Sequence, residues 1–433
     1  MKIFKYPSPA AMKKLDAISN RHLGYKSQDV QAVKRILKDV QKNKDKALID
    51  YINRFDAPKL TADALKVTKD EIKAARGSVD KEFLRSLNKA ARKIEAFHTH
   101  QTQQSWFTTN ADGTVLGQLV RPVNAAGVYV PGGRGGETPL VSSVLMGCIP
   151  ARIAEVRNIS ITTPPTKSGQ VNPHLLVAAQ RVGVETIYKA GSAWGIAALA
   201  YGTETVRRVD VIVGPGNIYV TLAKQLVSGT VGIDMIAGPS EVLVIADETA
   251  NAQYVAADLL SQAEHDPLAS AILITPSQAL AEAVSDTLIE QLKDLPRRSI
   301  AEASVKAYGA VIVVPDLATG FDLANQIAPE HLELHLEEPF QYLGNVENAG
   351  AIFLGPHTPE PVGDYMAGPN HVLPTAGTAR FASALSVDHF IKKTSVIYYA
   401  EKALKKDSED IIRLAQIEGL SAHARAIRIR KEK

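Results

Sequence analysis

The sequence has almost no cysteine, almost no net charge and no long apolar run, and each absence excludes a class of protein. Cys148 is the single cysteine, so an intrachain disulfide and a cysteine-cluster zinc site are both excluded. Lysine and arginine number 49 against 46 acidic residues, and the net charge of +3 gives no basic footprint for nucleic acid. No apolar run approaches the ~20 residues that a membrane-spanning helix needs. Any metal must therefore be held by histidine, carboxylate or amide side chains.

The start of the chain, Met1 to Pro7, also lacks the apolar core of a signal peptide. We therefore expect a cytoplasmic protein without a membrane or nucleic-acid partner. A length of 433 residues exceeds one ordinary core, which favours two or three domains. Cys148 stands in an apolar stretch and is predicted to be a small core residue.

Hydrophobic periodicity divides the chain into a helical beginning, an alternating middle and a helical end. Apolar residues recur at helical spacing between residues 30 and 52, and a second helical pattern covers 70–97. From residue 126, short β-branched runs alternate with helical patterns, which is typical of parallel, doubly wound sheets. The predicted strands suit two sheets better than one. They are 127–130, 159–162, 186–189, 209–213, 242–246, 271–274, 310–314, 331–335 and 351–354, with helices at 175–182, 196–201, 219–226 and 251–264 between them.

Two glycine-bearing turns follow predicted strands and could bind a nucleotide phosphate. Pro-Gly-Gly-Arg-Gly-Gly occupies 131–136, and Gly-Pro-Gly-Asn at 214–217 opens a helix. Free backbone N–H groups and the helix dipole converge on such turns and attract phosphate. Neither turn is a clean GxGxxG, so a plain tight turn remains the alternative for each.

Ser-Gln-Ala-Glu-His at 261–265 closes the predicted helix at 251–264. Gln262 and His265 are three residues apart and share one helix face, which places an oxygen and a nitrogen ligand side by side. The alternative is a polar last turn with His265 near the negative end of the helix dipole.

Ala-Pro-Glu-His-Leu-Glu-Leu-His at 328–335 combines a carboxylate and an imidazole at the start of a predicted strand. Pro329 forces the preceding residue to be extended, and the strict alternation from residue 332 indicates a strand. Glu330 and His331 would face opposite sides of a regular strand, so both line one pocket only at its irregular start. Together they offer two proton acceptors of different strength. Ordinary solvated groups are the alternative.

Further polar residues follow in a loop rich in glycine and proline and in the tail. Asp364 and His371 lie in the loop, where sites are often built, although Asp364 could simply form a turn. Glu418 precedes Gly419, a predicted helix-ending glycine, and His423 alone would ordinarily be a solvated histidine. No Gly-x-Ser-x-Gly elbow, Walker loop or HExxH motif occurs. The residues alone indicate an α/β enzyme and leave nucleotide and metal dependence open.

In their order, these motifs resemble those of the histidinol dehydrogenase family. The resemblance covers nearly the whole chain from about residue 126, and the helical N-terminal third is compatible with it. The motifs that carry it are GPGN at 214–217, GIDMIAGPSEVLVIAD at 232–247, LLSQAEH at 259–265, APEHL at 328–332, GDY at 363–365, NHVLPT at 370–375, and EGL with AH at 418–423.

The resemblance implies a zinc-dependent enzyme that oxidises L-histidinol through L-histidinal to L-histidine with two NAD, in the final steps of histidine biosynthesis. It also implies two Rossmann-like, doubly wound α/β domains in a homodimer with shared active sites. The implied parts are an N-terminal arm at 1–25, a main α/β domain with the zinc ligands and catalytic pair at 26–128 and 241–385, an NAD-binding domain at 129–240, and a helical C-terminal dimerisation tail at 386–433.

The resemblance assigns zinc to Gln262, His265 and Asp364, together with His423 of the partner subunit. A glutamine oxygen would be an unusual zinc ligand, whereas the remaining nitrogen and oxygen donors suit zinc. His331 would take the alcohol proton while hydride leaves to NAD, and Glu330 would activate water to hydrate the aldehyde. Substrate contacts are implied for Ser240, Gln262, His265, Glu330, His331, Asp364, His371, Glu418 and His423.

The implied NAD contacts are Tyr129, Asn217 and the position of Trp194. Many family members have glutamine where this chain has Trp194, whose ring could only stack on the cofactor. The loop at 133–142 is also longer than usual in the family. Both departures concern NAD binding and leave the zinc and proton chemistry unchanged.

Two other functions remain open. A relative that oxidises another small alcohol, such as a sulfonated propanediol, would use the same zinc and base. Glu418, His371 and His423 favour histidinol, because they would contact its imidazole and amino groups. A non-catalytic zinc- or nucleotide-binding protein is the second alternative. The pair Glu330 and His331 argues against it, since a binding module has no use for paired bases.

Overall fold

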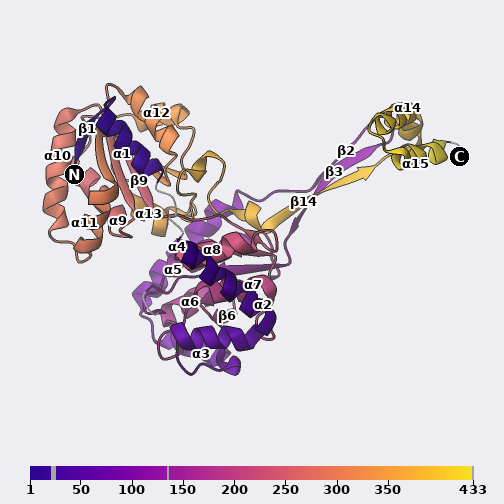
Figure 1. Cartoon of the computed structure of the whole chain (residues 1–433), viewed down its shortest axis with the longest axis horizontal. Helices are drawn as coiled ribbons and strands as arrows, with labels where there is room; N and C mark the ends of the chain where they lie inside the picture. The colour runs from indigo at the N-terminus through magenta and orange to yellow at the C-terminus, as the bar shows by residue number, and fades with distance from the viewer. Residues whose placement is uncertain (21–25, 134–135, 432–433) are drawn as a thin grey trace. The chain divides into compact units, whose positions relative to one another are not determined.

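The computed structural model describes residues 1–20, 26–133 and 136–431. They form two compact units: residues 1–101 with 124–390, and residues 102–123 with 391–433. The first unit holds two parallel sheets, and the second a small antiparallel sheet with two helices (Figure 1). Arg134 and Gly135 of the predicted glycine turn, and with them part of the longer loop, lie outside the described residues. So do 21–25 of the predicted arm.

A five-stranded parallel sheet has the strand order β6-β5-β4-β7-β8. Its strands are short, and most of their residues are buried, as expected where helices cover a parallel sheet. The strands are β4 (Ala125–Tyr129), β5 (Asn158–Thr163), β6 (Thr186–Lys189), β7 (Val211–Val213) and β8 (Gly232–Ile233). The connecting helices are α5 (Val141–Ile153), α6 (Pro173–Arg181), α7 (Ser192–Tyr201) and α8 (Ile218–Val227).

The N-terminal helices α2 (Ser27–Phe55), α3 (Lys69–Gly77) and α4 (Lys81–Thr99) pack against helices of this same sheet. Helix α2 contacts α7 and α8, α3 contacts α6, and α4 contacts α5. This differs from the expected assignment of 26–128 to the domain of the other sheet. The reason is that the apolar face of α2 shares one core with α7 and α8. Hydrophobic periodicity reveals such a face but not the surface that it meets.

A six-stranded parallel sheet has the order β1-β11-β10-β9-β12-β13. One of its faces packs against α1 and α12, and the other against α9, α10 and α11 (Figure 1). Its strands are β1 (Ile3–Lys5), β9 (Glu241–Ala246), β10 (Ser270–Thr275), β11 (Gly309–Val313), β12 (His331–His335) and β13 (Ala351–Leu354). Its helices are α1 (Pro9–Ser19), α9 (Ala252–Ala263), α10 (Gln278–Leu292), α11 (Arg298–Tyr308) and α12 (Leu317–Ile327).

The predicted N-terminal arm is in fact part of this sheet. Strand β1 pairs in parallel with β11, with Phe4 opposite Ile312, and Phe4 is buried in the core. A strand of three residues is too short to show a period in the sequence.

The second unit contains the antiparallel sheet β14-β3-β2 and the helices α14 (Glu401–Ile417) and α15 (Ser421–Lys431). Its strands are β2 (Trp106–Thr109), β3 (Val115–Pro122) and β14 (Ile391–Tyr398). The prediction of a wholly helical tail from residue 386 is therefore wrong for β14. This strand pairs with β3 from Ile391 opposite Pro122 to Tyr398 opposite Val115. Its side chains are exposed or half-buried on both faces. Because neither face is buried, the sequence of this strand does not need the alternation of polar and apolar residues by which a strand is recognised.

All nine strands predicted from the alternating middle are present, and the α/β fold class is confirmed. Three of them, at 186–189, 331–335 and 351–354, begin and end where predicted. The remaining short elements are helical turns: η1 (Ala62–Ala64), η3 (Pro339–Asn345), α13 (Glu360–Val362), η4 (Gly363–Ala367), η5 (Thr378–Arg380) and η6 (Val387–Phe390). Among the described residues, no helix combines the length and apolar character needed to cross a membrane.

Candidate active site

Glu330 and His331 lie at the amino end of β12, beside the first residue of β9. The N–H of Glu241 donates to Glu330 Oε2 at 2.9 Å, and the N–H of Glu330 donates to Glu241 Oε2 at 3.2 Å. His331 Nδ1 is 2.9 Å from the carbonyl oxygen of Glu241. A carbonyl only accepts, so Nδ1 carries the proton and Nε2 of the neutral ring is left as an acceptor. Glu241 thus orients both members of the predicted catalytic pair.

Burial shifts the two pKa values in opposite directions, because it disfavours each charged form. His331 is 4% exposed, and burial lowers its pKa to about 4. Burial, and after it the Glu241 carboxylate, raise the pKa of Glu330 well above its ordinary value. At neutral pH the imidazole is therefore a neutral base.

The last turn of α9 presents Gln262 and His265. Asn251 begins the helix by accepting from the N–H of Gln253. Gln262 is fully buried, and its Oε1 has no hydrogen-bond partner in the described chain. A buried, unpartnered amide oxygen is destabilising unless something else coordinates it. Its Nε2 lies 3.5 Å from His265 Nδ1, so the two side chains are adjacent as predicted.

Asp364, on the π-helical turn η4, lies beside the predicted catalytic pair. Ligand atoms of His331, Glu360 and Asp364 fall within 4.8 Å of one another. Asp364 raises the pKa of both His265 and His331, whereas His371 lowers both, although burial is the larger effect in each case. The structure therefore brings together His265, His331 and the loop residues Asp364 and His371, which come from three separate parts of the sequence.

Two acidic residues in this group were not identified from the sequence. Glu241 begins an otherwise apolar strand, and that single charged residue was the available signal. Glu360 is 3% exposed, and burial, then Asp364 and Glu333, raise its pKa to about 8. Glu360 stands between two prolines in an irregular segment, which gives no sequence signal for burial.

The remaining predicted substrate contacts are distributed over both units. Ser240 directly precedes β9 and is half-buried, and its carbonyl accepts from the N–H of Ser270. His371 is also half-buried, and its buried Nε2 has no partner within residues 136–431 or the rest of the described chain. Glu418 and His423 belong to the second unit, where Glu418 ends α14 and His423 lies in α15. Both are exposed, and their predicted contacts stay predictions.

The predicted cofactor turn lies at the carboxyl edge of the five-stranded sheet, between the ends of β4 and β7. Strand order reverses between these neighbours, and such switch points are where open α/β sheets bind ligands. Asn217 begins α8, and its side chain accepts from the N–H groups of Tyr219 and Val220. Gly214 has φ +113°, and a Cβ there would lie 2.1 Å from the carbonyl oxygen of Tyr129. Only glycine permits this close approach of two backbones.

A buried ion pair holds the backbone of this turn in place. Lys224 and Asp234 form a salt bridge with side chains 2% and 0% exposed. Lys224 Nζ donates to the carbonyl of Gly214 at 2.8 Å, and Asp234 Oδ2 accepts from the Gly214 N–H at 2.7 Å. Both backbone groups of Gly214 are therefore held by charged side chains.

Trp194 is buried in the first turn of α7, against the end of α2. The residue is 6% exposed, and its Nε1 donates to Asp56 Oδ2 at 3.0 Å. Its ring stacks on Phe55 with centroids 5.4 Å apart, and on Tyr51 at 5.9 Å. The predicted stacking on NAD is therefore not supported by an exposed ring face. Tyr129 is also buried, and its hydroxyl accepts from the N–H of Ser192 at 3.2 Å.

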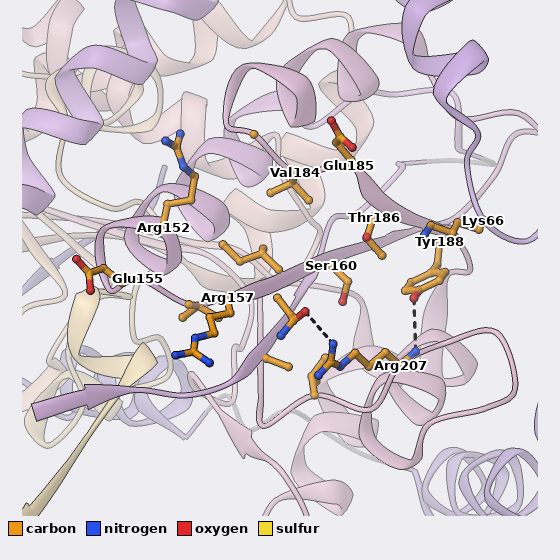
Figure 2. A pocket seen from close by; sticks show the side chains of 16 residues that line it. Lys66, Arg152, Glu155, Arg157, Ser160, Val184, Glu185, Thr186, Tyr188 and Arg207 are labelled. Carbon is orange, nitrogen blue, oxygen red and sulfur yellow. Dashed lines mark hydrogen bonds between the residues drawn. The ribbon is translucent and has the colours of Figure 1, made fainter.

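A cavity of about 630 Å³ lies at the amino ends of β4, β5 and β6 (Figure 2). Arg207 lines it, with its guanidinium bonded to Asn158 Oδ1 at 2.8 Å and its N–H to the Tyr188 hydroxyl at 3.4 Å. None of the residues predicted to bind zinc, substrate or cofactor lines this cavity. It lies at the edge of the sheet opposite to the cofactor turn.

The chain has two parallel sheets. One ends in a tight glycine turn at Gly214, and the other carries the buried acid-base pair Glu330 and His331 beside the unpartnered Gln262 oxygen. These features place the chain among the α/β enzymes. The family model for histidinol dehydrogenase matches residues 20–431, and the chain belongs to this family. A histidinol dehydrogenase of Desulfotalea psychrophila is 56% identical over 416 residues, 96% of each chain. That of Clostridium acetobutylicum is 51% identical over 401 residues, 93% of this chain and 92% of its own. The crystal structure of histidinol dehydrogenase from Elizabethkingia anophelis matches with a TM-score of 0.93 at 39% identity, covering 100% of this chain and 98% of that one.

Proposed function

We propose that this chain is a zinc-dependent cytoplasmic enzyme that oxidises L-histidinol through L-histidinal to L-histidine with two NAD, in the final steps of histidine biosynthesis. The observation that carries the proposal is the buried pair Glu330 and His331 beside Gln262, His265 and Asp364. A protein that only bound a metal or a nucleotide would have no need for two buried proton acceptors of different strength.

The donor atoms fit a zinc ion. Gln262 offers a buried oxygen without a partner, and His265 and Asp364 add a nitrogen and an oxygen nearby. We propose that these three residues and His423 of the partner subunit hold the ion. When bound, zinc would orient the substrate through the substrate's amino and imidazole nitrogens.

Association of two copies is supported by the surface of the second unit. This unit exposes several large apolar side chains, and exposed apolar surface is common where another chain binds. They include Trp106, Phe107, Ile397, Tyr398, Leu414 and Ile417. Exposed His423 and Glu418 would be available to the active site of the partner subunit.

His331 and Glu330 divide the proton transfers in this proposal. The Nε2 of neutral His331 accepts the alcohol proton while hydride passes to NAD, which serves as the oxidant in both steps. Glu330 Oε2 is bonded to the N–H of Glu241, so Oε1 is the oxygen available to a water molecule. A carboxyl group of raised pKa is a stronger base once ionised, and this suits activation of water that adds to the aldehyde.

NAD would be held at the switch point of the five-stranded sheet, with Asn217 and Tyr129 as contacts. The Gly214 N–H donates to Asp234, and those of Tyr219 and Val220 donate to Asn217, so the backbone N–H groups between them, at the beginning of α8, would meet the pyrophosphate. Trp194 would not contact NAD itself. Its hydrogen bond to Asp56 and its stacking on Phe55 hold the start of α7 against the end of α2.

The decisive experiment follows NADH formation with L-histidinol after chelation, with and without zinc added back. We expect activity to fall to background on chelation and to return with zinc, with two NADH formed per histidinol. A sulfonated propanediol in place of histidinol tests the nearest alternative substrate. Turnover of that alcohol without turnover of histidinol would contradict the proposed substrate, and full activity in chelator would contradict the metal dependence.

A further inference from the structure

A buried network of hydrogen bonds joins the loop that carries His371 to two helices of the five-stranded sheet. Asn370, which directly precedes His371, is 4% exposed, and His98 in the last turn of α4 is fully buried. Asn370 Nδ2 lies 3.3 Å from His98 Nε2 and donates to the carbonyl of Met146, on α5, at 2.9 Å. Neither Asn370 nor His98 takes part in the function proposed above.

The position of the ring proton makes His98 an acceptor for Asn370. His98 Nδ1 is 2.9 Å from the carbonyl oxygen of Ile94, one turn earlier in α4. A carbonyl only accepts, so Nδ1 carries the proton of the neutral ring. Burial lowers the pKa of His98 more than the backbone groups of Ile94 and Leu385 raise it, and the ring is therefore neutral. Its Nε2 accepts from the side-chain amide of Asn370.

The amide of Asn370 is satisfied on both its nitrogen and its oxygen. The two N–H groups bond to His98 and to the Met146 carbonyl, and Oδ1 accepts from the N–H of Val372 at 3.0 Å. The opposite orientation would place the amide oxygen against a carbonyl oxygen, where no hydrogen bond forms. Asn370 therefore holds the chain on both sides of His371, at residue 370 itself and at Val372.

The same loop is fixed at two further points. Gly368 has φ +117°, and a Cβ there would lie 2.8 Å from the carbonyl oxygen of Lys93, so glycine is required where the loop meets α4. Thr375 Oγ1 accepts from the N–H of Gly238, two residues before Ser240. The loop thus contacts α4 at one end and, at the other, the segment that leads into a second proposed substrate contact.

We propose that Asn370, held by His98, is a positioning residue that fixes His371 for contact with the substrate. This inference rests on the function proposed above, in which His371 contacts histidinol. The buried Nε2 of His371 has no partner in the described chain, so no side-chain bond to that atom orients the ring. Its place depends on the backbone that Asn370 anchors. Groups that orient a binding side chain in this way contribute to affinity without touching the ligand.

Two substitutions of His98 separate positioning from stability. Glutamine can reach the place of Nε2 with an amide oxygen, so His98→Gln keeps an acceptor for Asn370. Asparagine reaches only as far as Nδ1, so His98→Asn leaves the Asn370 amide without that acceptor. Both variants create a similar loss of packing. His100→Asn, at an exposed histidine two residues further on, is a control for the same change of residue type.

Initial rates at varied histidinol and varied NAD provide the first readout. In His98→Asn we expect the KM for histidinol to rise by roughly 10- to 100-fold, the order of loss that a displacement of about 1 Å at a site can cause. The KM for NAD should stay unchanged, and His98→Gln and His100→Asn should resemble the wild type. Asn370→Ala breaks the same bond from the other side and should match His98→Asn. A lower melting temperature without a change in the KM for histidinol would show a purely structural bond and overturn the inference.

The effect should also depend on the presence of His371. In a His371→Asn background, adding His98→Asn should raise the KM for histidinol no further, because the side chain to be positioned is already gone. If the two losses instead multiply, His98 and Asn370 do not act through His371.

Crystal structures of the two His98 variants provide a readout that needs no substrate. We expect His371 to be displaced in His98→Asn and to keep its place in His98→Gln. An unmoved His371 in both variants would overturn the inference, whichever alcohol the enzyme oxidises. A displaced His371 in a protein that does not oxidise histidinol would support the positioning role and contradict the proposed function. The two proposals can therefore fail separately.

Discussion

The two parallel sheets of the first unit use opposite edges. In the five-stranded sheet, the candidate cofactor residues Tyr129 and Asn217 lie at the carboxyl edge, where β4 ends and α8 begins. In the six-stranded sheet, Glu330 and His331 lie at the amino edge, where β12 begins. Ligands of open α/β sheets usually bind at the carboxyl edge. The six-stranded sheet departs from that rule.

Helix direction explains the difference. A helix that follows a strand begins at the carboxyl edge and ends at the amino edge. The carboxyl edge therefore presents the positive ends of helix dipoles, which suit phosphate, and the amino edge presents the negative ends, which suit cations. Gln262 and His265 at the end of α9 fit a metal on this ground. In the proposed function, the five-stranded sheet would bind the anionic cofactor, and the six-stranded sheet would bind the cation and supply the side chains that exchange protons.

The largest expected effect tests the six-stranded sheet. His331→Asn removes the proposed base and should slow the first hydride transfer by about 10² to 10⁴-fold, the usual worth of a general base. Glu330→Gln should instead keep a first-turnover burst of NADH and stall at oxidation of the aldehyde. Rapid-mixing measurements with L-histidinol and with L-histidinal separate the two steps. Equal loss of the first step in both variants would mean that the pair acts as one coupled unit.

The second-largest effect is expected in the five-stranded sheet, where no catalytic side chain is proposed and a buried ion pair holds the glycine turn. Lys224→Met leaves Asp234 buried without its cation and should destabilise the protein by about 3–5 kcal/mol. Lys293→Met breaks the exposed pair with Glu290 and should cost no more than about 1 kcal/mol. Denaturant unfolding measures both. Similar losses for the two variants would show that the ion pair does not hold the turn at Gly214.

The sequence predicted the parts of each sheet that follow from apolar runs. All nine predicted strands lie in the two buried sheets, where continuous apolar runs are required. Strands β2 and β14 were missed because Trp106–Thr109 is wholly exposed and Ile391–Tyr398 has no buried face. Periodicity could not assign α2 to a sheet, because an apolar face does not identify its partner.

Within the site, the sequence motifs identified Gln262, His265 and the pair Glu330 and His331. They did not identify the residues that orient and surround these side chains. Glu241 and Glu360 are buried acids whose neighbours in space come from other elements. Burial of a charged residue depends on tertiary contacts and leaves no local pattern. Trp194 illustrates the same limit. The sequence shows tryptophan where many family members have glutamine, but it does not show that Asp56 accepts a hydrogen bond from this tryptophan.

A third prediction follows from the pKa of His331 in the metal-free protein. Unfolded histidine binds a proton near pH 6.5, whereas folded His331 does so only near pH 4. Protonation therefore favours the unfolded chain between these values, and stability falls as the pH drops through this window. The loss specific to His331 should reach about 3 kcal/mol. In His331→Asn this contribution is absent, so its unfolding free energy should depend less on pH between 6.5 and 4. Parallel curves for the two proteins would contradict a buried, neutral His331.

The smallest expected effect separates the two roles of Asn217 at the carboxyl edge. Its side chain accepts from the N–H groups of Tyr219 and Val220, so Asn217→Ala should cost about 1 kcal/mol of stability. Asn217→Asp keeps an acceptor at the start of α8 and should unfold like the wild type. The aspartate nevertheless places a negative charge where the pyrophosphate of NAD is proposed to bind, and should raise the KM for NAD without changing that for histidinol. Denaturant unfolding and initial rates at varied NAD measure the two effects. If Asn217→Asp binds NAD as the wild type does, the cofactor does not approach this turn, and the contrast between the two edges would rest on the six-stranded sheet alone.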